Sequence, residues 1–148
     1  MKFVNKELAI KLKEKGFDKP CFGWYDIENN DDKLILNVHE GTLSYKNLLE
    51  YTNDIKTIAD APTIEQILEW LRDEKNVYIG IMPYFAMSTK NNIMWQWEIL
   101  LVGKIIECEN TLYTVKDYNY TKLASADHYE TYDDACTAAI NFIVEHLI

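Results

Sequence analysis

The stretch that decides the fold is IMWQWEILLV, residues 93–102. Five apolar side chains occupy every second position of it, namely Ile93, Trp95, Trp97, Ile99 and Leu101. Because successive side chains of a strand point to opposite faces, this spacing predicts a strand with one broad apolar face. Gln96 and Glu98 make its other face more polar. We expect this strand to lie at the centre of a sheet, with helices over the apolar face.

Further strands are predicted on both sides of this stretch. Alternating apolar residues and turn-forming Asn, Asp and Gly delimit them. The predicted strands are Cys21–Glu28 and Lys33–His39, which form a hairpin, followed by Val77–Tyr84, Lys104–Glu109 and Thr111–Lys116. A mainly antiparallel sheet of four to six strands follows from the order of strands and helices along the chain.

Helices are indicated by capping residues. Thr63 with Gln66 forms a capping box that begins a helix running to Lys75. A second capping box, Thr131 with Asp134, begins a helix over 132–147. Asn5 begins a helix over 6–15, which Gly16 ends in a left-handed cap whose next residue, Phe17, folds back on the last turn. The sequence therefore predicts about three helices.

Together these elements predict a single α+β domain over residues 1–148, with the helices largely on one face of the sheet. The predicted order is α-β-β-α-β-β-(β-β)-α. Residues 40–60 are expected to be mostly loop, although Ser44 could cap a short helix through Leu49. Residues 117–129 are expected to form a loop with a short edge strand.

Charge is unevenly distributed along the chain. The formal net charge is −9, and residues 1–20 carry six Lys against three acids, so the remainder has nine bases against twenty-one acids, a balance of −12. An acidic body repels a phosphate backbone, which disfavours direct nucleic-acid binding except through the Lys-rich first helix. Solubility by itself is a sufficient explanation of the acidity.

Cysteine usage and hydropathy indicate a cytoplasmic protein. Cys21, Cys108 and Cys136 are odd in number and lack metal-ligand or disulfide spacing, which predicts reduced thiols. The first residues lack the apolar run of a signal peptide, and no apolar stretch approaches the 18 or so residues of a membrane span.

An acidic cluster before the last predicted helix is the sharpest candidate for chemistry. Its members are Asp127, His128, Glu130, Asp133 and Asp134. Carboxylates and an imidazole could hold a divalent ion, but the segment lacks the regular ligand spacing and the glycine of a metal-binding loop. A capped helix with a solvated acidic first turn explains it better. His39 and His146 have no recognisable partner spacing and are expected at the surface.

Catalytic motifs are lacking from the sequence. There is no nucleophile elbow, no phosphate-binding loop and no dinucleotide fingerprint, and the five Gly are scattered singly. Cys136 near a helix start lies on the apolar side of that helix, where a buried structural thiol is expected. We therefore expect no catalytic residues, no metal and no cofactor.

The polar face of the central strand is the candidate interaction face. Tyr78, Met94, Gln96 and Glu98 are expected on the side opposite the two tryptophans. If helices cover only one side of the sheet, an aromatic patch remains on the other. Exposed patches of this kind usually bind a partner, often a second copy.

Three segments show a resemblance. KEKGFDKPCFGWY (13–25), APTIEQILEWLRDEK (61–75) and YETYDDACTAAI (129–140) resemble short hypothetical proteins common in Bacteroides-type gut bacteria and in their phages and mobile elements. The match follows helix starts and stops, and it implies no activity and no functional residues. Relative to the short members, residues 40–60 and 107–126 are longer.

Three functional hypotheses result. The first is a non-catalytic, cytoplasmic domain of phage or mobile-element type that binds another protein or itself, as in a homodimer. The second is an acidic DNA mimic or anti-defence protein that binds a basic host protein through residues including Glu65, Glu69, Asp133 and Asp134. The third is a metal-dependent enzyme with its site at 127–134.

Overall fold

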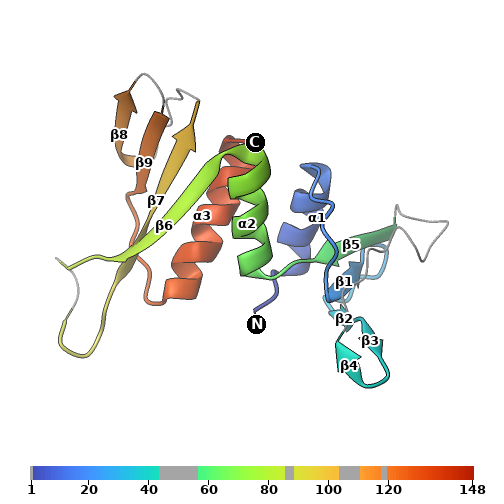
Figure 1. Cartoon of the computed structure of the whole chain (residues 1–148). Helices are drawn as coiled ribbons and strands as arrows, with labels where there is room; N and C mark the ends of the chain where they lie inside the picture. Colours follow the sequence, from blue (N-terminus) through green and yellow to red (C-terminus); the bar gives the residue numbers. More distant parts are fainter. Residues whose placement is uncertain (1, 44–56, 86–88, 104–110, 118–119) are drawn as a thin grey trace. The chain divides into compact units, whose positions relative to one another are not determined.

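The computed structural model describes residues 2–43, 57–85, 89–103, 111–117 and 120–148 (Figure 1). For residue 39 and for residues 111–117 only the backbone is described. The chain divides into two compact units, 1–70 and 71–148, and each is presented by itself. Within the described ranges, no helix has the length and apolarity needed to cross a membrane.

The order of elements confirms the predicted α+β class and its antiparallel pairing. In chain order the elements are α1 (Lys6–Glu14), β1 (Gly23–Asp26), β2 (Ile35–Leu36), β3 (Val38–His39), β4 (Thr42–Leu43), β5 (Ile58–Ala61), α2 (Ile64–Lys75), β6 (Val77–Pro83), β7 (Trp95–Val102), β8 (Thr111–Asp117), β9 (Tyr120–Ser125) and α3 (Tyr132–His146). They form sheets with the orders β2-β1-β5, β3-β4 and β6-β7-β9-β8.

In the first unit, α1 begins and ends as its sequence predicts. The Asn5 side chain accepts from the Leu8 N–H at 2.9 Å. At the other end, the Phe17 N–H donates to the Leu12 carbonyl and the Gly16 N–H to the Lys13 carbonyl, while Gly16 has a φ of 87°. These two bonds are the Schellman pattern, which satisfies carbonyls that the helix leaves open.

The predicted hairpin is confirmed, with shorter strands than expected: β1 pairs with β2 in the register Gly23↔Leu36. A second hairpin joins β3 to β4 through Glu40 and Gly41, whose φ values of 51° and 78° match a two-residue turn of type I′. The expectation that 40–60 is mostly loop is wrong at both ends, since 42–43 and 58–61 are strands. Residues 44–56, with the suggested short helix, lie outside the described residues.

The strand β5 was missed because its sequence, IADA, has little strand propensity. It becomes a strand by pairing antiparallel with β1 along its whole length, from Gly23↔Ala61 to Asp26↔Ile58. Ala59 and Ala61 are fully buried. Small side chains on β5 allow close packing with α1, which contacts this strand. Tertiary pairing therefore overrides local preference here.

The helix α2 follows its predicted capping box. The Thr63 N–H donates to the Gln66 side-chain oxygen at 3.0 Å, and the Gln66 N–H donates to the Thr63 hydroxyl at 3.4 Å. Trp70 on this helix is 1% exposed, and its ring packs edge-on against the Phe17 ring with centroids 5.4 Å apart. Phe17, the residue that follows Gly16 at the end of α1, therefore contacts α2.

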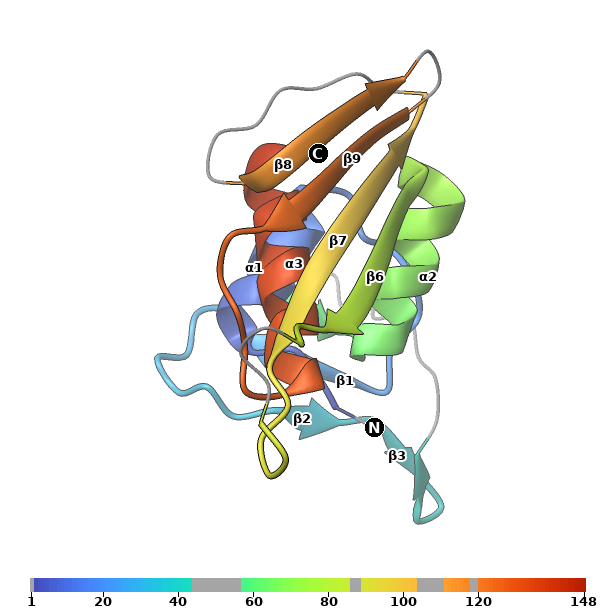
Figure 2. The same cartoon turned by 90° about the vertical axis from the view of Figure 1, so that its left-hand side faces the viewer.

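In the second unit, β7 lies inside the sheet as predicted, paired with β6 on one side and β9 on the other. Trp97, Ile99 and Leu101 are buried on one face. The helix α3 packs on β6 and β7, and the Phe142 ring lies 4.9 Å from the Trp97 ring. Figure 2 shows α3 behind this sheet.

Two boundaries in this unit differ from the prediction. The strand begins at Trp95, so Ile93 is not part of the apolar face and its side chain is 51% exposed. Residues 120–125, expected as loop or edge, form the interior strand β9 between β7 and β8. Its sequence, YTKLAS, is too polar for an interior strand by pattern alone, yet Thr121, Leu123 and Ser125 are buried. Residues 104–110, predicted to continue as strand, lie outside the described residues.

Candidate functional site

The face of the four-stranded sheet that lies opposite α3 carries the candidate site, and we call it the outer face. Ladder partners point to the same side of a sheet. The registers Tyr78↔Leu100↔Lys122 and Gly80↔Glu98↔Ala124 therefore form two adjacent rows across β6, β7 and β9. The predicted interaction residues Tyr78, Gln96 and Glu98 all belong to this face. Met94, the fourth of them, precedes the strand, and its carbonyl accepts from the Tyr84 N–H.

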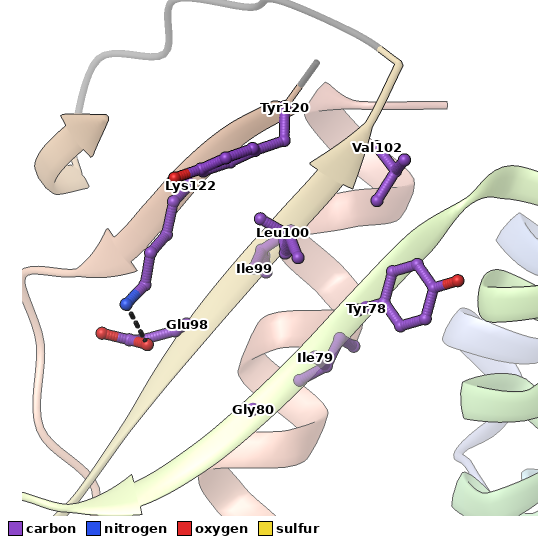
Figure 3. Close-up of a pocket in the computed structure, with 9 residues that line it drawn as sticks. All are labelled: Tyr78, Ile79, Gly80, Glu98, Ile99, Leu100, Val102, Tyr120 and Lys122. Atoms are coloured by element: carbon purple, nitrogen blue, oxygen red, sulfur yellow. Dashed lines mark ion pairs between the residues drawn. The ribbon is translucent and has the colours of Figure 1, made fainter. Parts of the chain in front are cut away.

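A groove of about 610 Å³ lies on the outer face. It is lined by Tyr78, Ile79, Gly80, Glu98, Ile99, Leu100, Val102, Tyr120 and Lys122. In Figure 3 the Tyr78 ring stands on β6 and the Tyr120 ring lies on β9, with Leu100 between them on β7. The groove is thus flanked by two aromatic rings and has an aliphatic floor.

Gly80 leaves open space on the β6 side of the groove. A Cβ atom built on Gly80 would meet nothing within 4 Å, and its φ is not in the left-handed region. The backbone conformation therefore does not require glycine there, and no packing does. Gly23 is different, because a Cβ there would lie 2.9 Å from the Ile35 carbonyl oxygen. Glycine inside a strand often marks the close approach of another molecule.

Charge on the groove comes from one ion pair. Glu98 and Lys122 lie diagonally across the β7–β9 ladder, and the Lys122 Nζ is 2.7 Å from a Glu98 carboxylate oxygen (Figure 3). The Glu98 side chain is 15% exposed and that of Lys122 is 35% exposed. Ala124, opposite Glu98, leaves room for this contact. The pair cancels the local charge of the groove.

Sequence reasoning found part of this site. Tyr78, Gln96 and Glu98 followed from strand alternation. The same strand alternation places Gly80, Leu100 and Val102 on this face, but the predicted interaction face did not include them. Tyr120 and Lys122 were missed because their segment was interpreted as a loop.

Comparison with known proteins identifies no relative. No family model, curated protein or solved structure matches this chain. The site must therefore be interpreted from its own geometry.

The acidic cluster at 127–134 is not assembled into a metal site. Among the residues that the structure describes, no group of three or more His, Cys, Asp or Glu side chains could hold a metal ion. Thr131 caps α3, accepting from the Asp134 N–H at 3.0 Å, and its hydroxyl lies 2.7 Å from the Asp134 carboxylate. This is the capped acidic first turn that the sequence favours.

His128 lies where the chain leaves the sheet after β9 and then returns to it. β9 ends at Ser125, whose hydroxyl accepts from the Trp97 N–H, and the chain returns to the sheet where Tyr129 pairs with Trp95. Between these points the His128 ring packs on the Tyr84 ring, with centroids 3.7 Å apart. His128 therefore has a packing role. His146 is exposed at the end of α3, with its ring 4.9 Å from that of Phe142, and His39 lies in β3.

The described cysteines are buried. Burial raises the pKa of the Cys21 thiol above its ordinary value, and the neighbouring Asp60 carboxylate raises this pKa further. Cys136 is fully buried, as its position on α3 predicts. The raised pKa disfavours a thiolate at Cys21. Cys108 lies outside the described residues.

Proposed function

We propose that this chain is a non-catalytic, cytoplasmic protein-binding domain of phage or mobile-element type, and that it binds through the outer face. The observation that carries the proposal is the groove at Gly80, where a glycine that the fold does not require leaves open space beside an exposed tyrosine. Strand glycine costs stability relative to other residues. Binding accounts for its presence.

The composition of the outer face supports a protein partner. Tyrosine is enriched at the centres of protein interfaces and charged residues are depleted there. Tyr78 and Val102 are each 42% exposed. Two charged side chains line the groove, those of Glu98 and Lys122, and they form an ion pair with each other. A groove with an exposed tyrosine ring at its rim is suited to a side chain projecting from another protein.

Affinity capture from cytoplasmic extract of the native host tests this proposal. The immobilised proteins are the wild type, Gly80→Leu, which fills the groove, and Lys90→Leu, which adds the same side chain at an exposed turn. We expect proteins, including further copies of this chain, to be retained by the wild type and by Lys90→Leu and lost with Gly80→Leu. Equal retention by all three would contradict the proposal.

A second candidate is the acidic DNA mimic. Glu65 and Glu69 on α2 and Asp133 and Asp134 on α3 are all exposed. This function predicts salt-sensitive binding that competes with duplex DNA. Replacing these four acids with Gln or Asn should abolish such binding. Capture that survives the replacement but is lost with Gly80→Leu would favour the outer face.

A further inference from the structure

We propose that the partner of the outer face is a second copy of this chain, in a twofold dimer in which the Tyr78 ring of each copy fills the hollow at Gly80 of the other. This inference rests on the proposed function, because it names the occupant of the same groove. It follows from the shape, the symmetry and the charge of the outer face.

The shape argument concerns two residues on one strand. The Tyr78 side chain projects from β6 with 42% of its surface exposed. Two residues further along, on the same face, Gly80 has no atom within 4 Å of its Cβ position. A projection and a matching hollow therefore lie next to each other on this strand. Interfaces of twofold dimers have this self-complementary character, because one patch must fit itself.

Symmetry extends the match across three strands. The proposed twofold axis lies in the plane of the interface and crosses β6 at Ile79. Rotation about this axis lays one row of one copy over the other row of its partner. The row Tyr78–Leu100–Lys122 then faces the row Gly80–Glu98–Ala124. The first row holds the bulkier side chains at both ends and the second row holds Gly and Ala there. Tyr78 then meets Gly80, while Lys122 lies over the strand position of Ala124, which is itself buried. The strands of the two copies then lie along nearly the same line but run in opposite directions, an aligned form of sheet packing.

Charge favours the same arrangement. The chain carries a net charge of −9, so two copies repel each other over most orientations. The groove contributes one negative and one positive side chain, Glu98 and Lys122, which cancel. In the twofold arrangement Lys122 of each copy lies alongside Glu98 of the other. Each of these side chains therefore gains a second partner of opposite charge. The outer face is therefore where two copies approach with attraction instead of repulsion.

Sedimentation analysis from about micromolar to millimolar concentration tests the dimer. We expect the wild type and Lys90→Leu to reach twice the 17.4 kDa mass of one chain. Tyr78→Gly or Gly80→Tyr should each weaken the dimer by about tenfold or more, as loss of a central aromatic contact does. The double variant Tyr78→Gly with Gly80→Tyr exchanges projection and hollow about Ile79, and it should restore the dimer.

A charge exchange provides an independent test that does not alter the strand backbone. The homodimer of the Glu98→Lys variant and that of the Lys122→Glu variant should each dissociate, because like charges then meet across the interface. Mixing the two variants should restore a dimer that contains one copy of each. A pair that acts only within one copy could not be repaired by mixing, so this result separates the interface from local structure.

The following outcomes would overturn the inference. The first is a folded chain, judged by circular dichroism, that stays monomeric at every concentration. The second is a dimer that none of these variants weakens. The third is a monomer that captures a different protein in a Gly80-dependent manner, which would refute self-association while the proposed function stands. A monomer with no Gly80-dependent capture would refute both.

Discussion

Gly80 lies directly opposite Glu98 in the β6–β7 ladder, and the position that a Cβ would take on Gly80 is open. Glycine in a strand costs about 0.5–1 kcal/mol relative to alanine. Gly80→Ala should therefore raise the free energy of unfolding by about this amount, measured by urea denaturation of dilute monomer. Gly23→Ala is the control, and it should lower stability because its Cβ would lie 2.9 Å from the Ile35 carbonyl oxygen. Equal effects of the two substitutions would contradict this structure.

Asp60 should make stability depend on pH. Burial raises its pKa from 3.8 to about 6, an effect that the neighbouring Lys13 partly opposes, and its Oδ1 is buried without a hydrogen bond. The folded state therefore binds the proton more tightly than the unfolded state. This contribution to stability is fully present below about pH 4, the unfolded pKa, and is lost as the pH rises through about 6.

The variant Asp60→Asn isolates this effect, because the amide is close in shape and cannot ionise. It should be more stable than the wild type at pH 7.5 by about 1–2 kcal/mol, an amount reduced by partial solvent screening. The difference between the two proteins should shrink as the pH falls from 7 to 4. Denaturation at a series of pH values measures it, and a difference that is constant with pH would refute the assignment.

Truncation should cost far more stability at Ile99 than at Ile93, although the alternating pattern of the sequence places both on the same face of one strand. Ile99 is fully buried on the α3 side of β7, whereas Ile93 is 51% exposed before the strand begins. Ile99→Ala should cost about 2–5 kcal/mol through lost burial and a cavity. Ile93→Ala should change stability by no more than about 0.5 kcal/mol. Thermal unfolding of the two variants compares them directly.

The N-cap hydrogen bond of α3 should make a measurable contribution to the free energy of unfolding. The Thr131 hydroxyl accepts from the Asp134 N–H at 3.0 Å. Thr131→Ala should lower the free energy of unfolding by about 0.5–2 kcal/mol, while Thr131→Ser retains the hydroxyl and should keep most of the stability. Thr137→Ala removes a hydroxyl of the same helix that bonds a helix carbonyl, and it should have a smaller effect. If Thr131→Ser costs as much as Thr131→Ala, the cap is not the cause.

Local signals explain most of what the sequence predicted correctly. Asn5, Thr63 and Thr131 begin their helices by bonding the open N–H groups of the first turn, and Gly16 ends α1 through its positive φ. These interactions span a few residues, so they can be recognised from spacing. The alternation of β7 also identified part of the outer face, because strand geometry assigns Gln96 and Glu98 to the face opposite Trp97.

The sequence by itself determined the α+β class, the helix boundaries and the two faces of β7. Only the tertiary structure decided that the polar segment 120–125 is an interior strand, that IADA pairs with β1, and that Gly80 opens a groove beside Tyr78. The reason is physical. Caps and alternation depend on neighbours along the chain, whereas ladder pairing and the depth of a groove depend on residues that only folding brings together.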